Sequence, residues 1–342
     1  MTAEQTSDKA IPLTDAGTAV PLGGQKAWVK LLSAQSFWVS VAVTITCVGM
    51  WIAYPRAFGT EENFFNITRN FSFIAIMALG ETLVIITGGI DLSVGSIMGV
   101  AGVVLGLSMS HGVSFWPSAA AAILAGAAMG LVNGGLVSYL RLSAFVVTLG
   151  TLSIGRSLAL AISNNKMFYE FGPDQALLLN LGGGATFGVA NSVWILLVLA
   201  VLLGSALKFT AWGRHIYAIG GNESAARLTG VAVDRVRLSV YMLSGVLSAI
   251  AAILMVGWLG SVTNALGLTY ELRVIASSVI GGVNLMGGEG GAYGTIIGSV
   301  LIEVIRNTLN MAGVDPYWQG TFVGLFIIFA VLLEKVRGLR LR

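Results

Sequence analysis

The chain contains ten apolar stretches that are each long enough, or nearly so, to cross a lipid bilayer as a helix. The hydrocarbon core of a bilayer is about 30 Å thick and needs roughly 20 apolar residues in helical form. Inside lipid, every backbone polar group must be bonded within the protein, so such stretches predict a helical bundle. We therefore expect an all-α, polytopic membrane protein with about ten transmembrane helices. The stretches are 37–54, 71–87, 92–110, 117–140, 142–162, 192–209, 236–258, 272–287, 292–311 and 317–333.

The composition agrees with a protein whose solvent is lipid. Of 342 residues, 56% are hydrophobic and 10% are charged, whereas soluble domains carry about 25% charged residues. The net charge of +3 is too small to suggest a nucleic-acid partner. The single cysteine, Cys47, and the distant His111 and His215 offer no metal-binding or catalytic spacing.

The basic residues give the orientation, because Lys and Arg accumulate in cytoplasmic loops. With ten spans and both termini in the cytoplasm, thirteen of the nineteen basic residues fall on the cytoplasmic side. One span more or fewer would place the basic C-terminal tail and the basic loop near Arg214 on opposite sides. The thirteen are Lys9, Lys26, Lys30, Arg141, Lys208, Arg214, Arg227, Arg235, Arg237, Lys335, Arg337, Arg340 and Arg342.

The chain divides into a tail and a membrane domain. Residues 1–30 are predicted to form a flexible cytoplasmic tail, since they begin with a Thr-, Asp-, Pro- and Gly-rich stretch without apolar periodicity. This stretch has neither the cationic start nor the apolar core of a signal peptide, so we expect the first helix to remain as an anchor. Residues 37–342 form the membrane domain, whose longest internal loop is 210–237.

The stretch "TGGIDLSVGS" (87–96) places an isolated acid between two apolar runs. Gly88 and Gly89 weaken the end of the second span, and Asp91 precedes Ser93 and Gly95 at the start of the third. An aspartate before a helix accepts backbone N–H bonds from the first turn, so Asp91 is expected to cap the third span at the cytoplasmic interface. A proton-coupling role stays open, since intramembrane acids are often functional. The segment "GGVNL" (281–285) repeats part of the pattern and also interrupts a span.

A few polar side chains within the spans are candidates for lining a pathway, because a charge inside the bilayer is costly unless it faces the protein interior or a wet cavity. Glu81 and Arg156 are the charged candidates, and a buried structural pair is the alternative for them. Glu303 and Arg306, three residues apart, are expected to pair with each other. The full set of candidate lining residues is Glu81, Asn133, Ser143, Ser153 and Arg156.

Glycines recur every fourth residue in several spans, which lets neighbouring backbones approach closely. The spacing does not say whether each stripe packs within the chain or against a second copy. The stripes are Gly95 and Gly99, Gly102 and Gly106, Gly126, Gly130 and Gly134, and Gly290, Gly294 and Gly298.

The loop 210–237 is predicted to hold a short helix. Asn222 can cap it, Glu223 favours its first turn, and Gly230 can end it. About seven helical residues are too few to be stable alone, so the helix needs a docking partner or packs on its own membrane domain. Gly220 and Gly221 are expected to act as a hinge. The residues assigned to this helix are Asn222, Glu223, Ala225, Ala226, Arg227, Leu228 and Gly230.

Two motifs together resemble the permease subunit of bacterial ABC sugar importers of the ribose, xylose and autoinducer-2 branch. They are "TGGIDLSVGS" and "GRHIYAIGGNESAARLTGVAVDRVRLSVYMLSG" (213–245), and "TLSIGRSLAL" (151–160) also matches. The resemblance extends from about residue 37 to the C-terminus. It implies a multi-pass protein of the bacterial inner membrane in which 222–230 is the coupling helix that contacts a separate ATP-binding subunit.

The resemblance also implies the partners. They are two cytoplasmic ATP-binding subunits, a second permease chain (identical or closely related) and a periplasmic sugar-binding protein. No cofactor is expected in this chain, because it contains no Gly-Lys dipeptide and therefore no P-loop for ATP. Without a catalytic set, the chain is expected to be a transporter subunit and not an enzyme. Two alternatives remain: an ion-coupled transporter that uses Glu81, Asp91 or Glu303, and a membrane scaffold or intramembrane enzyme that moves no solute.

Overall fold

A computed structural model describes residues 35–315, 318, 320–322, 324–325 and 328 of the chain. The described part is mostly helical, with one small antiparallel hairpin of β1 (Ala185–Thr186) and β2 (Val189–Ala190). The helices are α2 (Gln35–Ala53), α3 (Pro55–Phe58), α4 (Glu61–Ile86), α5 (Val94–Ser110), α6 (Phe115–Ser138), α7 (Ala144–Ser163), the 3₁₀ turn η1 (Gly172–Asp174), α8 (Gln175–Gly183), α9 (Asn191–Phe209), α10 (Ala211–Gly221), α11 (Glu223–Leu228), α12 (Val233–Leu259), α13 (Tyr270–Ile280) and α14 (Ala292–Met311).

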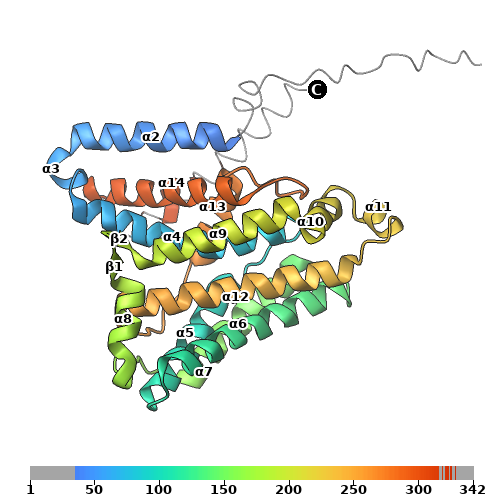
Figure 1. The fold of residues 1–342 in the computed structure, drawn as a ribbon, viewed down its shortest axis with the longest axis horizontal. Coiled ribbons are helices and arrows are strands. Elements are labelled where there is room, and N and C mark those ends of the chain that lie inside the picture. Colours follow the sequence, from blue (N-terminus) through green and yellow to red (C-terminus); the bar gives the residue numbers. More distant parts are fainter. Residues whose placement is uncertain (1–34, 316–317, 319, 323, 326–327, 329–342) are drawn as a thin grey trace, which may run out of the picture.

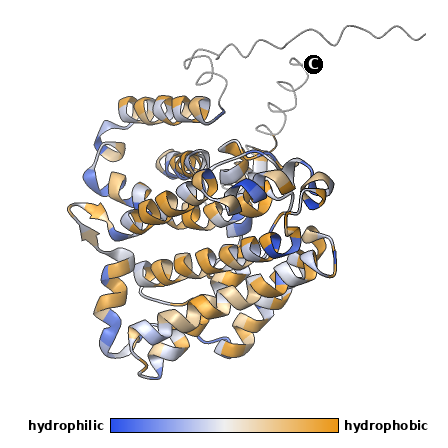
Figure 2. Ribbon diagram, turned by 45° about the vertical axis from the view of Figure 1, so that its right-hand side comes forward, coloured by the Kyte–Doolittle hydropathy of each residue, from blue (hydrophilic) through white to orange (hydrophobic). Residues whose placement is uncertain are grey.

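The long helices lie side by side, with α12 and α4 in the interior of the bundle (Figure 1). Helix α12 packs against α6, α4, α8 and α5, whereas α2 lies at an edge beside α14. The central helices are the most buried. In the most apolar stretch of 18 residues, 83% of the residues of α4 and 78% of those of α12 are buried, against 11% of those of α2. The peripheral helices therefore present apolar side chains outward, and Figure 2 shows hydrophobic colour along the helices and on their outer faces.

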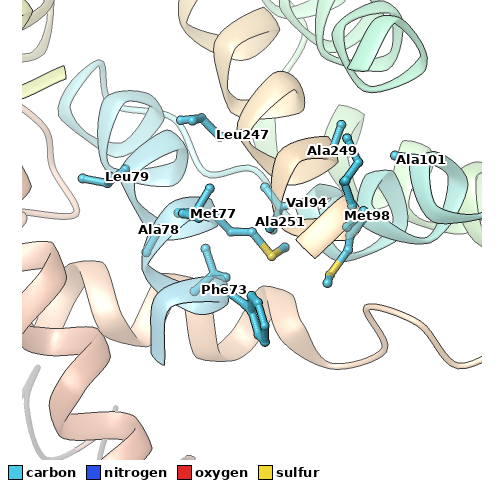
Figure 3. Packing of buried hydrophobic residues seen from close by; sticks show 14 of the residues in the cluster. Phe73, Met77, Ala78, Leu79, Val94, Met98, Ala101, Leu247, Ala249 and Ala251 are labelled. Atoms are coloured by element: carbon cyan, nitrogen blue, oxygen red, sulfur yellow. The ribbon is translucent and has the colours of Figure 1, made fainter. Parts of the chain in front are cut away.

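The core at the centre of the bundle joins α4, α5 and α12 (Figure 3). Phe73 and Met77 of α4 lie near Met98 of α5, while Leu247 and Ala251 of α12 come from the opposite side, and all five are buried. The small residues of α12 let its backbone approach α4 and α5 closely, as expected for helices that pack inside lipid.

Each of the first nine predicted spans contains a helix, but not every helix is long and apolar enough to cross a bilayer alone. Among the described residues, six helices meet that requirement: α2, α4, α6, α7, α9 and α12. Helix α5 has 17 residues and α13 only 11, while α14 has 20 but carries Glu303 and Arg306. The predicted tenth span, 317–333, lies largely outside the described residues, as does the predicted tail.

Candidate functional site

The motif at 87–95 is a break between α4 and α5 that lies inside the protein. Gly88 has a φ of +81°, which reverses the chain after α4. The N-cap of α5 is Ser93, so the prediction that Asp91 occupies this position is wrong. Instead, the Asp91 carboxylate accepts hydrogen bonds from the backbone N–H of Ser93 at 2.9 Å and from its hydroxyl. Asp91 is completely buried and thus shielded by protein on every side.

Glu81 reaches the same break from within α4. Its Oε1 accepts the backbone N–H of Asp91 at 3.0 Å, ten residues further along the chain. Asn133 of α6 donates from Nδ2 to the Ser93 hydroxyl at 2.8 Å. The structure therefore joins Glu81, Asp91, Ser93 and Asn133, which the sequence had placed in two separate groups. The other two polar candidates, Ser143 and Ser153, are exposed and lie apart from this cluster at the start and middle of α7.

Arg156 does not pair with Glu81. Its Nη1 donates to the backbone carbonyl of Leu266 at 2.7 Å. Its Nη2 has no hydrogen-bond partner, and neither has Oε2 of Glu271. A Cβ built on Gly95 would contact both of these atoms, so the guanidinium and the carboxylate face the same point of α5.

Leu266 belongs to residues 260–269, a non-helical segment that runs along the glycine face of α5. Side chains added to Gly102 and Gly106 would overlap Leu266 and Val262. Gly95 and Gly106 are eleven residues apart, so the segment follows α5 for about 16 Å. Non-helical backbone at such a depth is tolerated only where protein or a wet cavity covers it. The segment is thus covered by the glycine face of α5, and Arg156 contacts it through the Leu266 carbonyl.

The two glycine-rich breaks contact each other. The backbone N–H of Gly288, in the loop between α13 and α14, donates to the carbonyl of Ile86 at the end of α4 at 2.9 Å. Gly220 of α10 packs on both, since a Cβ there would overlap the Ile86 carbonyl and the Gly288 backbone. Gly220 and Gly221 form the last turn of α10, and the hinge predicted at these residues stays a prediction.

Helix α11 extends from the end of the bundle at which α12 begins (Figure 1). Asn222 caps it as predicted, with its Oδ1 accepting the N–H of Ala225 at 2.9 Å, and Gly230 follows it with a φ of +85°. Ala226 is buried against the protein, so this side of the helix packs on its own membrane domain. Leu228 is 89% exposed and is the apolar side chain that the helix presents outward.

An ion network fixes α11 to the first turns of α12. Arg227 pairs with Glu223 at 3.0 Å and also with Asp234, and Arg237 pairs with Glu223 at 2.7 Å. Hydrogen bonding from Arg237 is the main reason why the pKa of Glu223 is lowered from its ordinary value, with Arg227 contributing in the same direction. The network orients a helix that is otherwise too short to be stable alone.

Three residues of these sites were absent from the sequence-based candidates. Tyr241 and Ser244 of α12 complete the surroundings of Asp91, and Glu271 faces Arg156. The sequence could have indicated Glu271, because an acid that directly precedes a predicted span is a candidate functional residue. No sequence feature could have indicated Tyr241 and Ser244, since their positions on α12 resemble those of ordinary helix-packing residues. The pairing of Glu303 with Arg306 is confirmed, with Arg306 Nε donating at 2.9 Å.

Comparison with known proteins identifies the family. Residues 63–331 match the family described as "Branched-chain amino acid transport system / permease component". The chain belongs to this permease family. It is 37% identical to the ribose import permease protein RbsC of Escherichia coli K12 over 91% of this chain and 95% of that protein. It is also 31% identical to the autoinducer 2 import system permease protein LsrC of Photorhabdus luminescens over 86% of this chain and 88% of that protein.

The matched region contains every site described above. It spans the Asp91 break, the segment 260–269 and α11, so all of these are parts of the permease fold itself. The resemblance drawn from the motifs is confirmed. The permease is a multi-pass membrane protein of the inner membrane.

Proposed function

We propose that this chain is the membrane-spanning permease subunit of an ATP-driven importer for a sugar or a related polyhydroxylated solute. The relatives named for ribose and autoinducer 2 import support this function. The observation that carries the mechanism is α11, a short capped helix that projects Leu228 from the bundle. A small rigid helix of this kind is suited to receiving a push from a partner that binds ATP.

In this proposal the permease has ten transmembrane helices, and both termini and α11 face the cytoplasm. Two ATP-binding subunits contact α11 of two permease chains, and a periplasmic sugar-binding protein delivers the solute to the opposite side. Force applied to α11 passes through its ion network to α12 and through the packing of α10 to the two glycine-rich breaks. We assign the change in pathway access to these breaks, because their irregular backbone can move without breaking a whole helix.

The pathway is assigned to Arg156, Glu271 and the segment 260–269. The guanidinium and the carboxylate face one point with one unfilled hydrogen-bonding atom each. Such a pair suits hydroxyl groups, which can accept from the guanidinium and donate to the carboxylate. Within this proposal Ser153 lines the same face of α7, whereas Asn133 belongs to the interior.

The test is uptake by proteoliposomes that contain the permease with its ATP-binding subunit and the sugar-binding protein. Labelled ribose is the first solute to try, and uptake should require ATP and continue in the presence of a protonophore. Uptake that stops with the protonophore and ignores ATP depletion would favour the ion-coupled alternative. Complete burial of Glu81 and Asp91 argues against that alternative, because a translocated ion must be able to enter and leave its site.

A further inference from the structure

A closed polar cluster lies at the meeting point of α4, α5, α6 and α12. Every member is 0% exposed. Hydrogen bonds link five of the six members, and the hydroxyl of the sixth, Tyr241, lies beside Gly89 in the same break. This acid cluster consists of Glu81, Asp91, Ser93, Asn133, Tyr241 and Ser244.

Three atoms of the acid cluster have no hydrogen-bond partner, and all three are oxygens. They are Oε2 of Glu81, Oδ1 of Asn133 and the hydroxyl oxygen of Tyr241. Asp91, in contrast, is well satisfied: Ser93 donates twice to Oδ1, and Ser244 donates to Oδ2 at 3.4 Å. Buried polar atoms are almost always paired. The Tyr241 hydroxyl can donate as well as accept, but Oε2 of an ionised Glu81 and Oδ1 of Asn133 can only accept, so these two oxygens lack a donor or a positive group.

The protein itself supplies no such group. No Lys, Arg or His nitrogen in the described part of the chain lies within 4.0 Å of either carboxylate. Helices α5 and α6 contain no charged residue. On α4 the nearest cation in sequence is Arg69, twelve residues or about 18 Å before Glu81.

The Lys and Arg residues on the surrounding helices either pair with residues outside the acid cluster or lie near helix ends. Arg237, one turn before Tyr241 on α12, is paired with Glu223, while Asp234 and Arg235 lie at the outer end of that helix. Arg156 of α7 donates to Leu266. Of the helices packed on the far side of α4, α14 carries the paired Glu303 and Arg306, and α13 carries Glu271 and Arg273 near its start. Lys208 and Arg214 lie at the far end of α9 and the start of α10.

We propose that the acid cluster binds one monovalent cation, either a proton or Na⁺, at Oε2 of Glu81. One positive charge removes the repulsion between two carboxylates in a place that excludes water, where an uncompensated charge is very costly. A proton would turn the unfilled Oε2 into a donor, and Na⁺ would instead draw together the unfilled oxygens of Glu81, Asn133 and Tyr241. A single charge is proposed because Oε2 of Glu81 is the one unfilled carboxylate oxygen of the cluster, whereas both oxygens of Asp91 already accept hydrogen bonds.

The cation is resident and is not transported with solute. The cluster has no exposed member, and Gly89 closes it, because a Cβ on Gly89 would lie 2.5 Å from the Tyr241 hydroxyl. The bound cation thereby fixes the break at residues 87–93 to α4, α6 and α12. This inference does not depend on which solute the permease moves.

The experiment uses the full-length permease purified in detergent. Its thermal unfolding is followed in NaCl and in choline chloride at equal ionic strength, and infrared spectroscopy records the carbonyl stretch of neutral carboxylic acids. Glu81→Gln is the test variant. Glu62→Gln, which changes an exposed acid on the same helix, is the matched control.

Two results support the site and tell the cations apart. If the cation is Na⁺, the unfolding midpoint of the wild type and of Glu62→Gln is higher in NaCl, and Glu81→Gln loses that difference. If it is a proton, the midpoint is equal in both salts, and the wild type and Glu62→Gln show a neutral-acid band that is missing from Glu81→Gln. The amide of Gln can donate as the acid does, so this variant then unfolds close to the wild type.

A wild type with no Na⁺ dependence and no neutral-acid band would overturn the inference, as would a band that persists in Glu81→Gln. Should Glu81→Gln fail to fold, wild-type protein with ¹³C-carboxyl glutamate and the same salt comparison decide the matter. The band must shift with the label or the midpoint must depend on Na⁺, and absence of both contradicts the site.

Discussion

Leu228 and Ala226 are two residues apart on α11 but have opposite environments. Ala226 is 4% exposed and Leu228 is 89% exposed, although the sequence assigned both to the same short helix without distinguishing them. Under the proposed function, a partner that docks on the outer side of α11 would contact Leu228, because it is the apolar side chain that the helix presents outward. Leu228 is therefore the residue at which to test contact with an ATP-binding partner.

Leu228→Asp is predicted to leave folding intact and to prevent coupling. The side chain touches little of its own chain, so the unfolding midpoint should stay close to that of the wild type. A buried aspartate in the interface would lack a partner, so co-purification with the ATP-binding subunit and ATP-driven uptake should fall at least tenfold. Leu228→Met keeps the apolar surface and serves as the control. Normal assembly and uptake with Leu228→Asp would remove α11 from the coupling surface.

The residue scale also shows what local sequence could and could not predict. The Asn222 cap and the Glu303–Arg306 pair are local, with spacings of three residues, and both were predicted correctly. Asp91 was predicted as the N-cap because it directly precedes the third predicted span, but Ser93 takes that position. Besides the nearby Ser93, the partners of Asp91 are Glu81 of α4 and Ser244 of α12, and no single-sequence pattern connects these two to it.

At the scale of elements, the glycine stripes of α5 and α6 have different partners. The stripe of α6 meets α12, as helix packing predicts: Gly126 faces Gly245, and Gly130 faces Tyr241 and Met242. The stripe of α5 instead accommodates the non-helical segment 260–269. Both stripes have the same spacing. The sequence therefore predicts that another backbone packs closely against each stripe, but not whether that backbone is a helix or an irregular segment.

Gly130→Ala and Gly135→Ala form a matched pair on α6 that tests this packing. A Cβ at Gly130 would lie 2.9 Å from Cα of Met242 and would overlap the Tyr241 carbonyl, whereas a Cβ at Gly135 has nothing within 4 Å. We expect Gly130→Ala to destabilise the permease by about 1–3 kcal/mol through overpacking. Gly135→Ala should be neutral or stabilising by up to about 1 kcal/mol, since alanine favours helix. Unfolding of the two variants in detergent measures the difference, and equal stabilities would contradict the packing of α6 on α12.

At the scale of the whole molecule, hydropathy predicts the order of the apolar segments along the chain. It does not predict how the irregular segments between the helices run through the bundle. The eighth predicted span, 272–287, contains only the short α13 (Tyr270–Ile280), and the non-helical segment 260–269 precedes it. The sequence located the helix there but could not show that the preceding chain runs back along α5, because that course depends on glycines more than 150 residues earlier. Tertiary packing thus decides the irregular parts, and these are the parts assigned to the pathway and to its breaks.

The orientation of the molecule can be tested with two cysteines at opposite ends of α12. Helix α11 precedes the start of α12, and the β1–β2 hairpin lies near its other end (Figure 1). In a Cys47→Ser background, Phe187→Cys changes a hairpin residue that is 94% exposed, and Ser224→Cys changes an exposed residue of α11. If α11 faces the cytoplasm, a membrane-impermeant maleimide should label Phe187→Cys in intact spheroplasts and Ser224→Cys only after permeabilisation. Equal labelling of both after permeabilisation is the control for reactivity. Labelling of Ser224→Cys in intact spheroplasts would reverse the proposed orientation and, with it, the side from which ATP drives the permease.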